Sequence, residues 1–141
     1  MDTGDPDVEK LAAKIVDAAF KVHSALGPGL LECVYEQCLS YELSQRGLRF
    51  ELQKPVPVTY GTVQIDCALR LDVLVEEKII IEIKAIETVL PVHKAQLLSY
   101  LCLANKPLGL LINFHVPLIK DGIKRIIHKA PPTFAPSRLR V

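Results

Sequence analysis

Two acids and one lysine interrupt very apolar segments in the middle of the chain. Glu82 and Lys84 lie within the isoleucine-rich stretch 78–85, and Asp72 lies within the apolar stretch 69–75. Side chains alternate along a strand, so Glu82 and Lys84 project from the same face. An unpaired buried charge is costly, and such groups normally pair with each other or bind a metal ion. The segment itself therefore leaves two interpretations open, a Glu82–Lys84 ion pair at the rim of a sheet or a cation site.

The register of these two strands decides whether Asp72 joins Glu82. The polar segment 76–78 predicts a turn, and hence an antiparallel hairpin. A three-residue loop pairs Val75 with Ile79 and places Asp72 opposite Glu82, with Cβ atoms about 4.5–5.5 Å apart. A two-residue loop places the two acids on opposite faces unless a bulge intervenes.

Two carboxylates at this distance repel each other, and a divalent cation would reverse the sign of their interaction. Mg²⁺ is typically held by one or two carboxylates together with waters and phosphate oxygens. Lys84, one pleat beyond Glu82, would orient the attacking water and stabilise charge on a phosphoryl transition state. The pattern of Asp72, Glu82 and Lys84 therefore predicts Mg²⁺-dependent hydrolysis of phosphodiesters, with Mn²⁺ as a substitute ion.

Flanking segments carry further candidates for the site. His93, Gln96 and Tyr100 share one face of a predicted helix, where they would contact phosphate or support the acids, unless they form an ordinary solvated stripe. Glu32 lies in the first turn of an earlier predicted helix and is a candidate metal ligand, although the helix dipole alone favours an acid there. Tyr35, one turn later, is an additional candidate of a type that more commonly packs into a core.

A basic cluster near the C-terminus is the candidate nucleic-acid contact. Its members are Lys120, Lys124, Arg125, Lys129, Arg138 and Arg140. Such a cluster favours sequence-independent contacts with phosphates, unless it is an ordinary solvated rim. Overall charge offers no comparable argument, because 17 basic and 16 acidic residues leave the chain at +1.

Hydrophobic periodicity predicts the elements that must position these side chains. Helical spacing predicts one helix that is capped by Asp5 or Asp7, a second over 30–45 and a third over 92–104. Strands are predicted at 48–52, 56–60, 63–75, 78–84, 108–114 and 123–128. This order indicates an α/β fold with a mixed central β-sheet flanked by helices.

Composition is consistent with one soluble domain. The 141 residues are 50% hydrophobic, which is enough material for a single core. We expect an acidic extension over 1–9, the domain over 10–129 and a proline-rich basic tail over 130–141. No apolar run approaches the ~20 residues of a membrane span, and the N-terminus is unlike a secretory signal. A cytoplasmic location without membrane contact is the resulting expectation.

Several segments of this sequence resemble motifs of a known protein family. The arrangement of Asp72 with 82–84 resembles the PD-(D/E)XK nuclease superfamily, and 96–100, QLLSY, resembles the QxxxY motif of its RecB-like branch. The segment 29–35, GLLECVY, is similar to the pattern that names the GxxExxY protein family, a small and mostly bacterial group in that superfamily. Two later segments, LGLLINF and KDGIKR, also resemble that family. The resemblance covers nearly the whole chain.

The resemblance implies a restriction-endonuclease-like fold. The site residues that it implies are Asp72 and Glu82 as metal ligands, Lys84 as an assistant in catalysis, Glu32 as an additional acid, and Gln96 and Tyr100 as supports of substrate or site geometry. Leu71 precedes Asp72 where the superfamily signature has proline, a departure that is common in the superfamily. The substrate is not implied.

Three functions are compatible with these features. The first is a Mg²⁺-dependent nuclease that acts on nucleic acid, with DNA favoured over RNA. The second is a catalytically silent nucleic-acid- or protein-binding module on the same fold. The third is a structural subunit of a homo-oligomer, such as a homodimer, that associates through an apolar edge. The complete acid and lysine set favours the nuclease.

Overall fold

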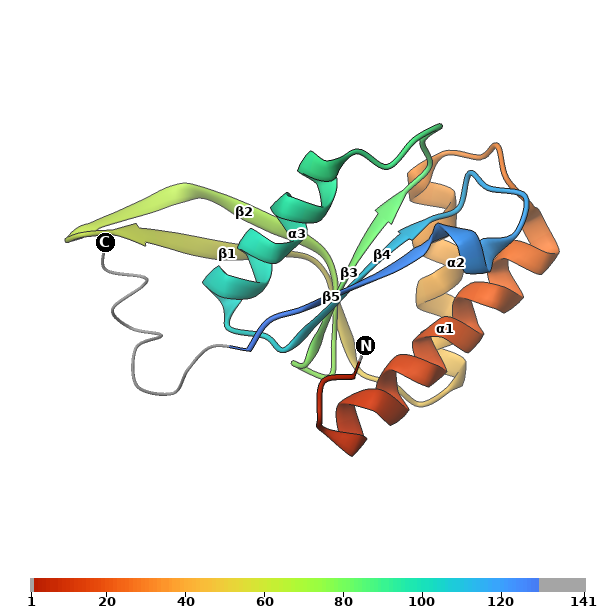
Figure 1. Cartoon of the computed structure of the whole chain (residues 1–141), viewed down its shortest axis with the longest axis horizontal. Helices are drawn as coiled ribbons and strands as arrows, with labels where there is room; N and C mark the ends of the chain where they lie inside the picture. Colours follow the sequence, from red (N-terminus) through yellow and green to blue (C-terminus); the bar gives the residue numbers. More distant parts are fainter. Residues whose placement is uncertain (1, 130–141) are drawn as a thin grey trace.

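The structure, a computed structural model, describes residues 2–129, without the side chains of residues 67 and 68. The described residues form three α-helices, one short 3-10 helix and a five-stranded sheet (Figure 1). In chain order the elements are α1 (Pro6–Leu26), α2 (Glu32–Gln45), β1 (Phe50–Tyr60), β2 (Val63–Val75), β3 (Ile79–Lys84), α3 (Pro91–Ala104), β4 (Leu108–Asn113), η1 (Ile119–Gly122) and β5 (Ile123–Ile127). The tail expected over 130–141, with two of the basic-cluster arginines, lies outside the described residues.

The sheet is mixed, as the sequence predicts. The strands follow the order β1-β2-β3-β4-β5, and only β3 and β4 run parallel to each other. A parallel pair needs a long crossover, and α3 provides it. The chain therefore has an α/β restriction-endonuclease-like fold.

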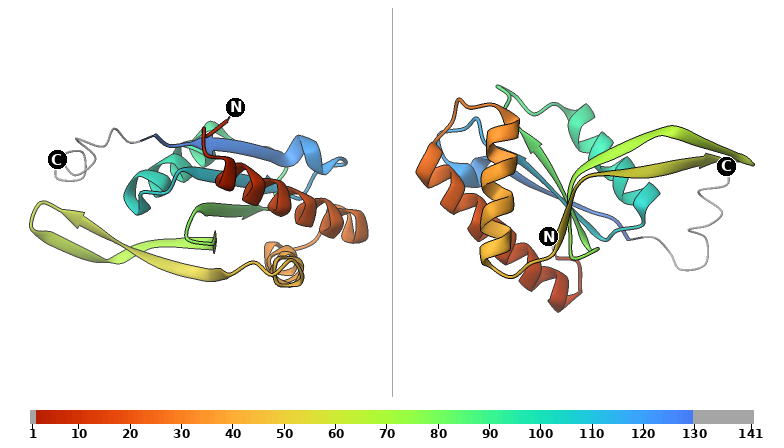
Figure 2. Two further views of the ribbon diagram at one scale, coloured as in Figure 1. Left: turned by 90° about the horizontal axis from the view of Figure 1, so that it is seen from below. Right: turned by 180° about the vertical axis from the view of Figure 1, so that it is seen from behind.

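Helices cover both faces of the sheet (Figure 2). On one face, α1 and α2 pack against alternate residues of the central strands, among them Val73 and Ile81. On the other face, α3 packs through Leu97 against residues such as Leu74 and Ile80. The isoleucines of β3 are buried on both faces, which confirms the expectation of a central strand.

Local signals account for the boundaries of the first two helices. The Asp5 carboxylate accepts hydrogen bonds from the backbone N–H groups of Asp7 and Val8, so α1 begins at Pro6. Residues 6–9, expected in an N-terminal extension, therefore form the first turn of α1. The second helix begins two residues later than predicted, because Leu31 has extended backbone angles and occupies the N-cap position.

The hairpin of β1 and β2 extends away from the rest of the sheet (Figure 1). The two short strands predicted over 48–60 are one edge strand, in which the ladder shifts between Val56 and Val58. Pro55 and Pro57 fit this place because an edge strand leaves one side of its backbone unpaired.

The carboxyl ends of β3 and β4 are tied together by a buried amide. The Asn113 side chain accepts hydrogen bonds from the backbone N–H groups of Ile86 and His115, and it donates to the Ile86 carbonyl at 2.9 Å. Asn113 is the register partner of Lys84. The amide therefore holds the two loops that flank this lysine.

Gly122→Ala should destabilise this edge of the sheet. A Cβ atom at position 122 would overlap the backbone carbonyl oxygen of Asn113. We expect the free energy of unfolding, measured in urea, to fall by about 1–3 kcal/mol. Gly109→Ala is the matched comparison, because the atoms nearest to its Cβ belong to the Leu97 side chain rather than to the backbone. Since a side chain moves more readily than a strand backbone, a larger loss for Gly109→Ala would contradict this account.

Candidate active site

The hairpin register brings Asp72 and Glu82 together. Val75 pairs with Ile79, as the three-residue loop predicts, and pairing continues for two more positions before the ladder ends. The next two residues are Asp72 and Glu82. The Asp72 carboxylate accepts a hydrogen bond from the backbone N–H of Ile83 at 2.9 Å. Asp72 therefore bridges to β3 with its side chain where backbone pairing stops.

Glu82 is the most unusual ionisable group of the site. It is only 7% exposed, and its Oε1 atom has no hydrogen-bond partner. The pKa of Glu82 is raised to about 8, with burial as the largest cause; the negative charge of Asp72 acts in the same direction, and the positive charge of Lys84 opposes the shift. Near neutral pH the protonated form of Glu82 is therefore favoured over the charged form.

The surroundings of Glu82 favour a cation site over an ion pair with Lys84. Within the described range, Glu82 and Lys84 do not form a salt bridge. A buried carboxyl oxygen without a partner, beside a second acid, is a suitable donor set for a hard divalent cation. In the part of the chain that the structure describes, no three His, Cys, Asp or Glu side chains are already placed to hold a metal ion. The acid pair thus fits a cation without forming a complete cage.

Helix α3 brings Tyr100 and Gln96 to the same face of the sheet. Partial burial raises the pKa of Tyr100, and the charges of Glu82 and Asp72 raise it further, while a hydrogen bond with Gln96 lowers it. Tyr100 is therefore close to the acid pair. His93 has a different role, because its Nδ1 atom accepts a hydrogen bond from the Leu90 N–H and caps α3.

Tyr35 is a core residue. Its side chain is fully buried, and its ring stacks on Phe114 at 4.5 Å between centroids. The hydroxyl donates a hydrogen bond to the Gly27 carbonyl at 2.6 Å and accepts one from the Leu30 N–H. Tyr35 therefore stabilises the turn between α1 and α2.

Helix α2 contributes an acid that was not predicted from the sequence. Glu36 is half-buried, and its Oε2 atom accepts a hydrogen bond from the Gln53 side chain at 3.0 Å. Burial raises the pKa of Glu36, and the charges of Asp72 and Glu32 contribute in the same direction. Glu32 is exposed on the same helix. The available signal was the spacing of four between Glu32 and Glu36, which places both on one side of a helix.

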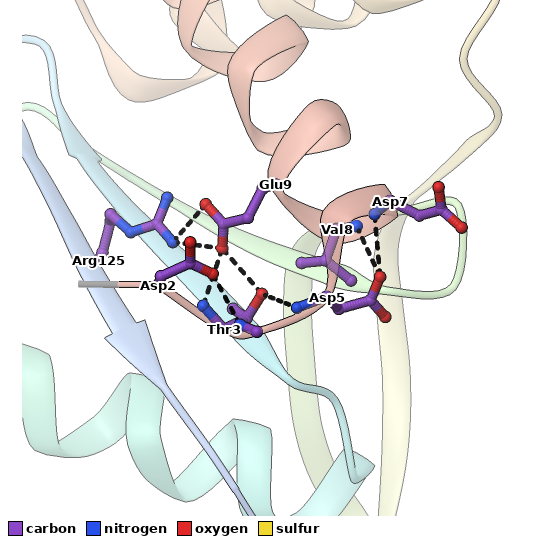
Figure 3. A network of polar contacts seen from close by, with 8 residues as sticks. Asp2, Thr3, Asp5, Asp7, Val8, Glu9 and Arg125 are labelled. Carbon is purple, nitrogen blue, oxygen red and sulfur yellow. Dashed lines mark hydrogen bonds and ion pairs between the residues drawn. The ribbon is translucent and has the colours of Figure 1, made fainter.

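The predicted basic cluster does not form one surface. Lys124 pairs with Leu111 and so lies on the α3 face of the sheet, whereas the neighbouring Arg125 points to the α1 face. There the Arg125 guanidinium bonds both carboxylate oxygens of Glu9, at 3.0 and 2.8 Å (Figure 3). Glu9 also accepts two hydrogen bonds from Thr3. Together with the hydrogen bonds from Arg125, these bonds lower the pKa of Glu9 to about 2.

Lys124 and Arg125 lie on opposite faces of the sheet because successive side chains alternate along β5. Arg125 is held in an intramolecular ion pair, so it is a poor candidate for contact with nucleic acid. Lys120, Lys124 and Lys129 are exposed. None of the helices in residues 2–129 is long and apolar enough to span a membrane.

Comparisons with known proteins address the family of this chain. A search of curated proteins finds no match. A similar solved structure, "Crystal structure of SSO0001", has 25% identity and a TM-score of 0.48, and the match covers 77% of this chain. The match covers 55% of that protein, so the present chain spans about half of its length. The model of the PD-(D/E)XK nuclease superfamily matches residues 9–126, which include the acid pair, Lys84 and the crossover helix. Because this match spans most of the sequence, the chain belongs to the PD-(D/E)XK nuclease superfamily.

Proposed function

We propose that this protein is a divalent-metal-dependent nuclease that hydrolyses phosphodiester bonds, with Mg²⁺ as its ion and DNA as its substrate. The observation that carries the proposal is the buried Glu82 carboxyl group, which lacks a hydrogen-bond partner at Oε1 and lies beside Asp72. The repulsion between two adjacent acids opposes folding, whereas a bound cation would stabilise both. Mn²⁺, with similar oxygen ligands, would substitute.

Each residue of the site then has a distinct role. Asp72 and Glu82 would hold the cation, and Glu82 would lose its proton when the ion binds. When bound there, a divalent cation would supply Lewis-acid polarisation of the phosphoryl group and a lowered pKa for water. Lys84 would orient the attacking water and stabilise the negative charge that develops on the phosphoryl oxygens. The hydrogen bond from the Ile83 N–H would keep the Asp72 carboxylate in place.

Neighbouring side chains would support binding of the substrate. Tyr100 and Gln96 would contact a phosphate beside the acid pair. Lys120, Lys124 and Lys129 are the exposed bases that remain for sequence-independent contacts with the backbone of nucleic acid. We also assign the chain to the GxxExxY branch of the superfamily, on the basis of the segment 29–35.

The direct test is cleavage of linear, circular and single-stranded DNA, and of RNA, with Mg²⁺, with Mn²⁺ and with EDTA. We expect cleavage of DNA that needs the divalent ion. Lys84→Ala should slow it on the order of 10²–10³-fold, because one charge that stabilises the transition state is lost. Lys94→Ala, at an exposed lysine of α3, is the matched control and should retain full activity.

Two results would contradict the proposal. Cleavage that is unaffected by EDTA would exclude the cation role of the acid pair. Salt-dependent binding of DNA without any turnover would instead identify a catalytically silent binding module.

A further inference from the structure

Glu36 and Asp72 belong to one cluster although they come from different elements. Glu36 lies in the second turn of α2, and the Asp72 charge acts on it across the gap between helix and sheet. On the other side, Asp72 contacts Glu82, whose Oε1 atom is buried and has no partner. Glu36, Asp72 and Glu82 therefore form a row of three acids in space, with Asp72 in the middle. The Oε1 atom of Glu82 has no hydrogen-bond partner.

Gln53 connects the helix to this cluster. It lies between Leu52 and Lys54 of β1, whose register partners are Val73 and Leu71, so it is opposite Asp72 in the hairpin. Its φ of 50° is in the left-handed region, which is uncommon for a residue with a side chain. From there the Gln53 amide donates a hydrogen bond to Oε2 of Glu36 at 3.0 Å. Because this bond occupies Oε2, Oε1 of Glu36 is the oxygen that could bind an ion.

We propose that Glu36, held by Gln53, is the third carboxylate that binds the catalytic cation, and that Glu32 is not a ligand. This inference rests on the proposed function. In the described residues no three His, Cys, Asp or Glu side chains are already placed to hold a metal ion, so the Glu36 side chain would have to rotate toward the ion when it binds. The hydrogen bond from Gln53 would then orient the ligand, as outer hydrogen bonds commonly do for metal-binding carboxylates.

Burial distinguishes Glu36 from Glu32. Glu36 is half-buried and directly bonded to a residue that lies opposite Asp72, whereas Glu32 is exposed at the start of α2. A partly buried side chain loses less conformational entropy on binding an ion than an exposed one, because part of its freedom is already lost. Glu32 would act on the site only through its charge.

The test is Mn²⁺ binding by calorimetry and electron paramagnetic resonance, which does not depend on activity. Glu36→Gln should weaken Mn²⁺ binding at least about 10-fold, whereas Glu32→Gln should change it less than about twofold. Gln53→Asn should weaken binding by about 10-fold, because Asn tolerates the left-handed backbone but is too short to reach Glu36. In the Glu36→Gln background, Gln53→Asn should have no further effect.

The outcomes separate this inference from the proposed function. If the parent protein binds no Mn²⁺, both are wrong. If the parent binds Mn²⁺ and Glu36→Gln binds it equally well, only the assignment of Glu36 is wrong. A loss with Glu32→Gln instead of Glu36→Gln would reverse the choice between the two acids. Urea unfolding of each variant shows whether its fold is intact.

Discussion

Glu82→Gln and Asp72→Asn each reduce metal-dependent DNA cleavage by on the order of 10²–10³-fold or more. Each substitution removes one carboxylate that would hold the cation, while the side-chain shape is nearly conserved. Asn at position 72 retains an oxygen that accepts the hydrogen bond from the Ile83 N–H, so the junction between β2 and β3 stays intact. The initial rate of cleavage at saturating Mg²⁺ is the measurement.

A matched acid in the loop after β3 provides the control. Glu87 has a side chain that is 90% exposed and pairs with His115 at 3.1 Å. Glu87→Gln should therefore cleave like the parent protein. Parent-like rates for Glu82→Gln, in a variant that unfolds at the same or a higher urea concentration, would show that this acid has no part in the reaction.

The metal-free protein becomes less stable as the pH rises from about 5 to about 8. Glu82 has a pKa of about 8 in the folded chain, against 4.5 as its ordinary value. Between these values the folded state binds one more proton than the unfolded state, so the free energy of unfolding falls as pH rises. The loss is on the order of 1.4 kcal/mol for each pH unit in this window, which amounts to a few kcal/mol.

Glu82→Gln should remove this part of the pH dependence. A neutral amide takes up no proton, so the variant should exceed the parent in stability at pH 8 and approach it near pH 5. Urea unfolding in EDTA at unit steps of pH measures both curves, and their difference cancels the contribution of the histidines. Glu9 titrates outside the window, because its lowered pKa places its loss of stabilisation in acid. Parallel curves for parent and variant would contradict the raised pKa of Glu82.

Local rules account for the part of the site that the sequence predicted. The register of the β2–β3 hairpin follows from the length of its turn, and the common face of Glu82 and Lys84 follows from the period of two along a strand. The burial of β3 follows from its isoleucines. In each case the interacting residues are within about a dozen positions of each other, where the geometry of one element or one turn decides the outcome.

Contacts between distant segments account for what was not predicted from the sequence. Arg125 was expected to contact nucleic acid, but it binds Glu9, which is 116 positions away. The spacing of Glu32 and Glu36 placed both on one side of a helix, but only the packing of α2 beside the hairpin gives Glu36 its hydrogen bond with Gln53 and exposes it to the charge of Asp72. Whether Glu82 and Lys84 form an ion pair also depended on tertiary packing, which buries Glu82 and leaves its Oε1 atom without a hydrogen-bond partner.

The sequence by itself determined the family of folds, the order of the elements, and the two acids and lysine on neighbouring strands. Only the tertiary structure decided which charges have partners inside the protein and which lack them. The physical reason is that alternation and turn length act within one element, whereas burial and ion pairing depend on which surfaces of separate elements meet.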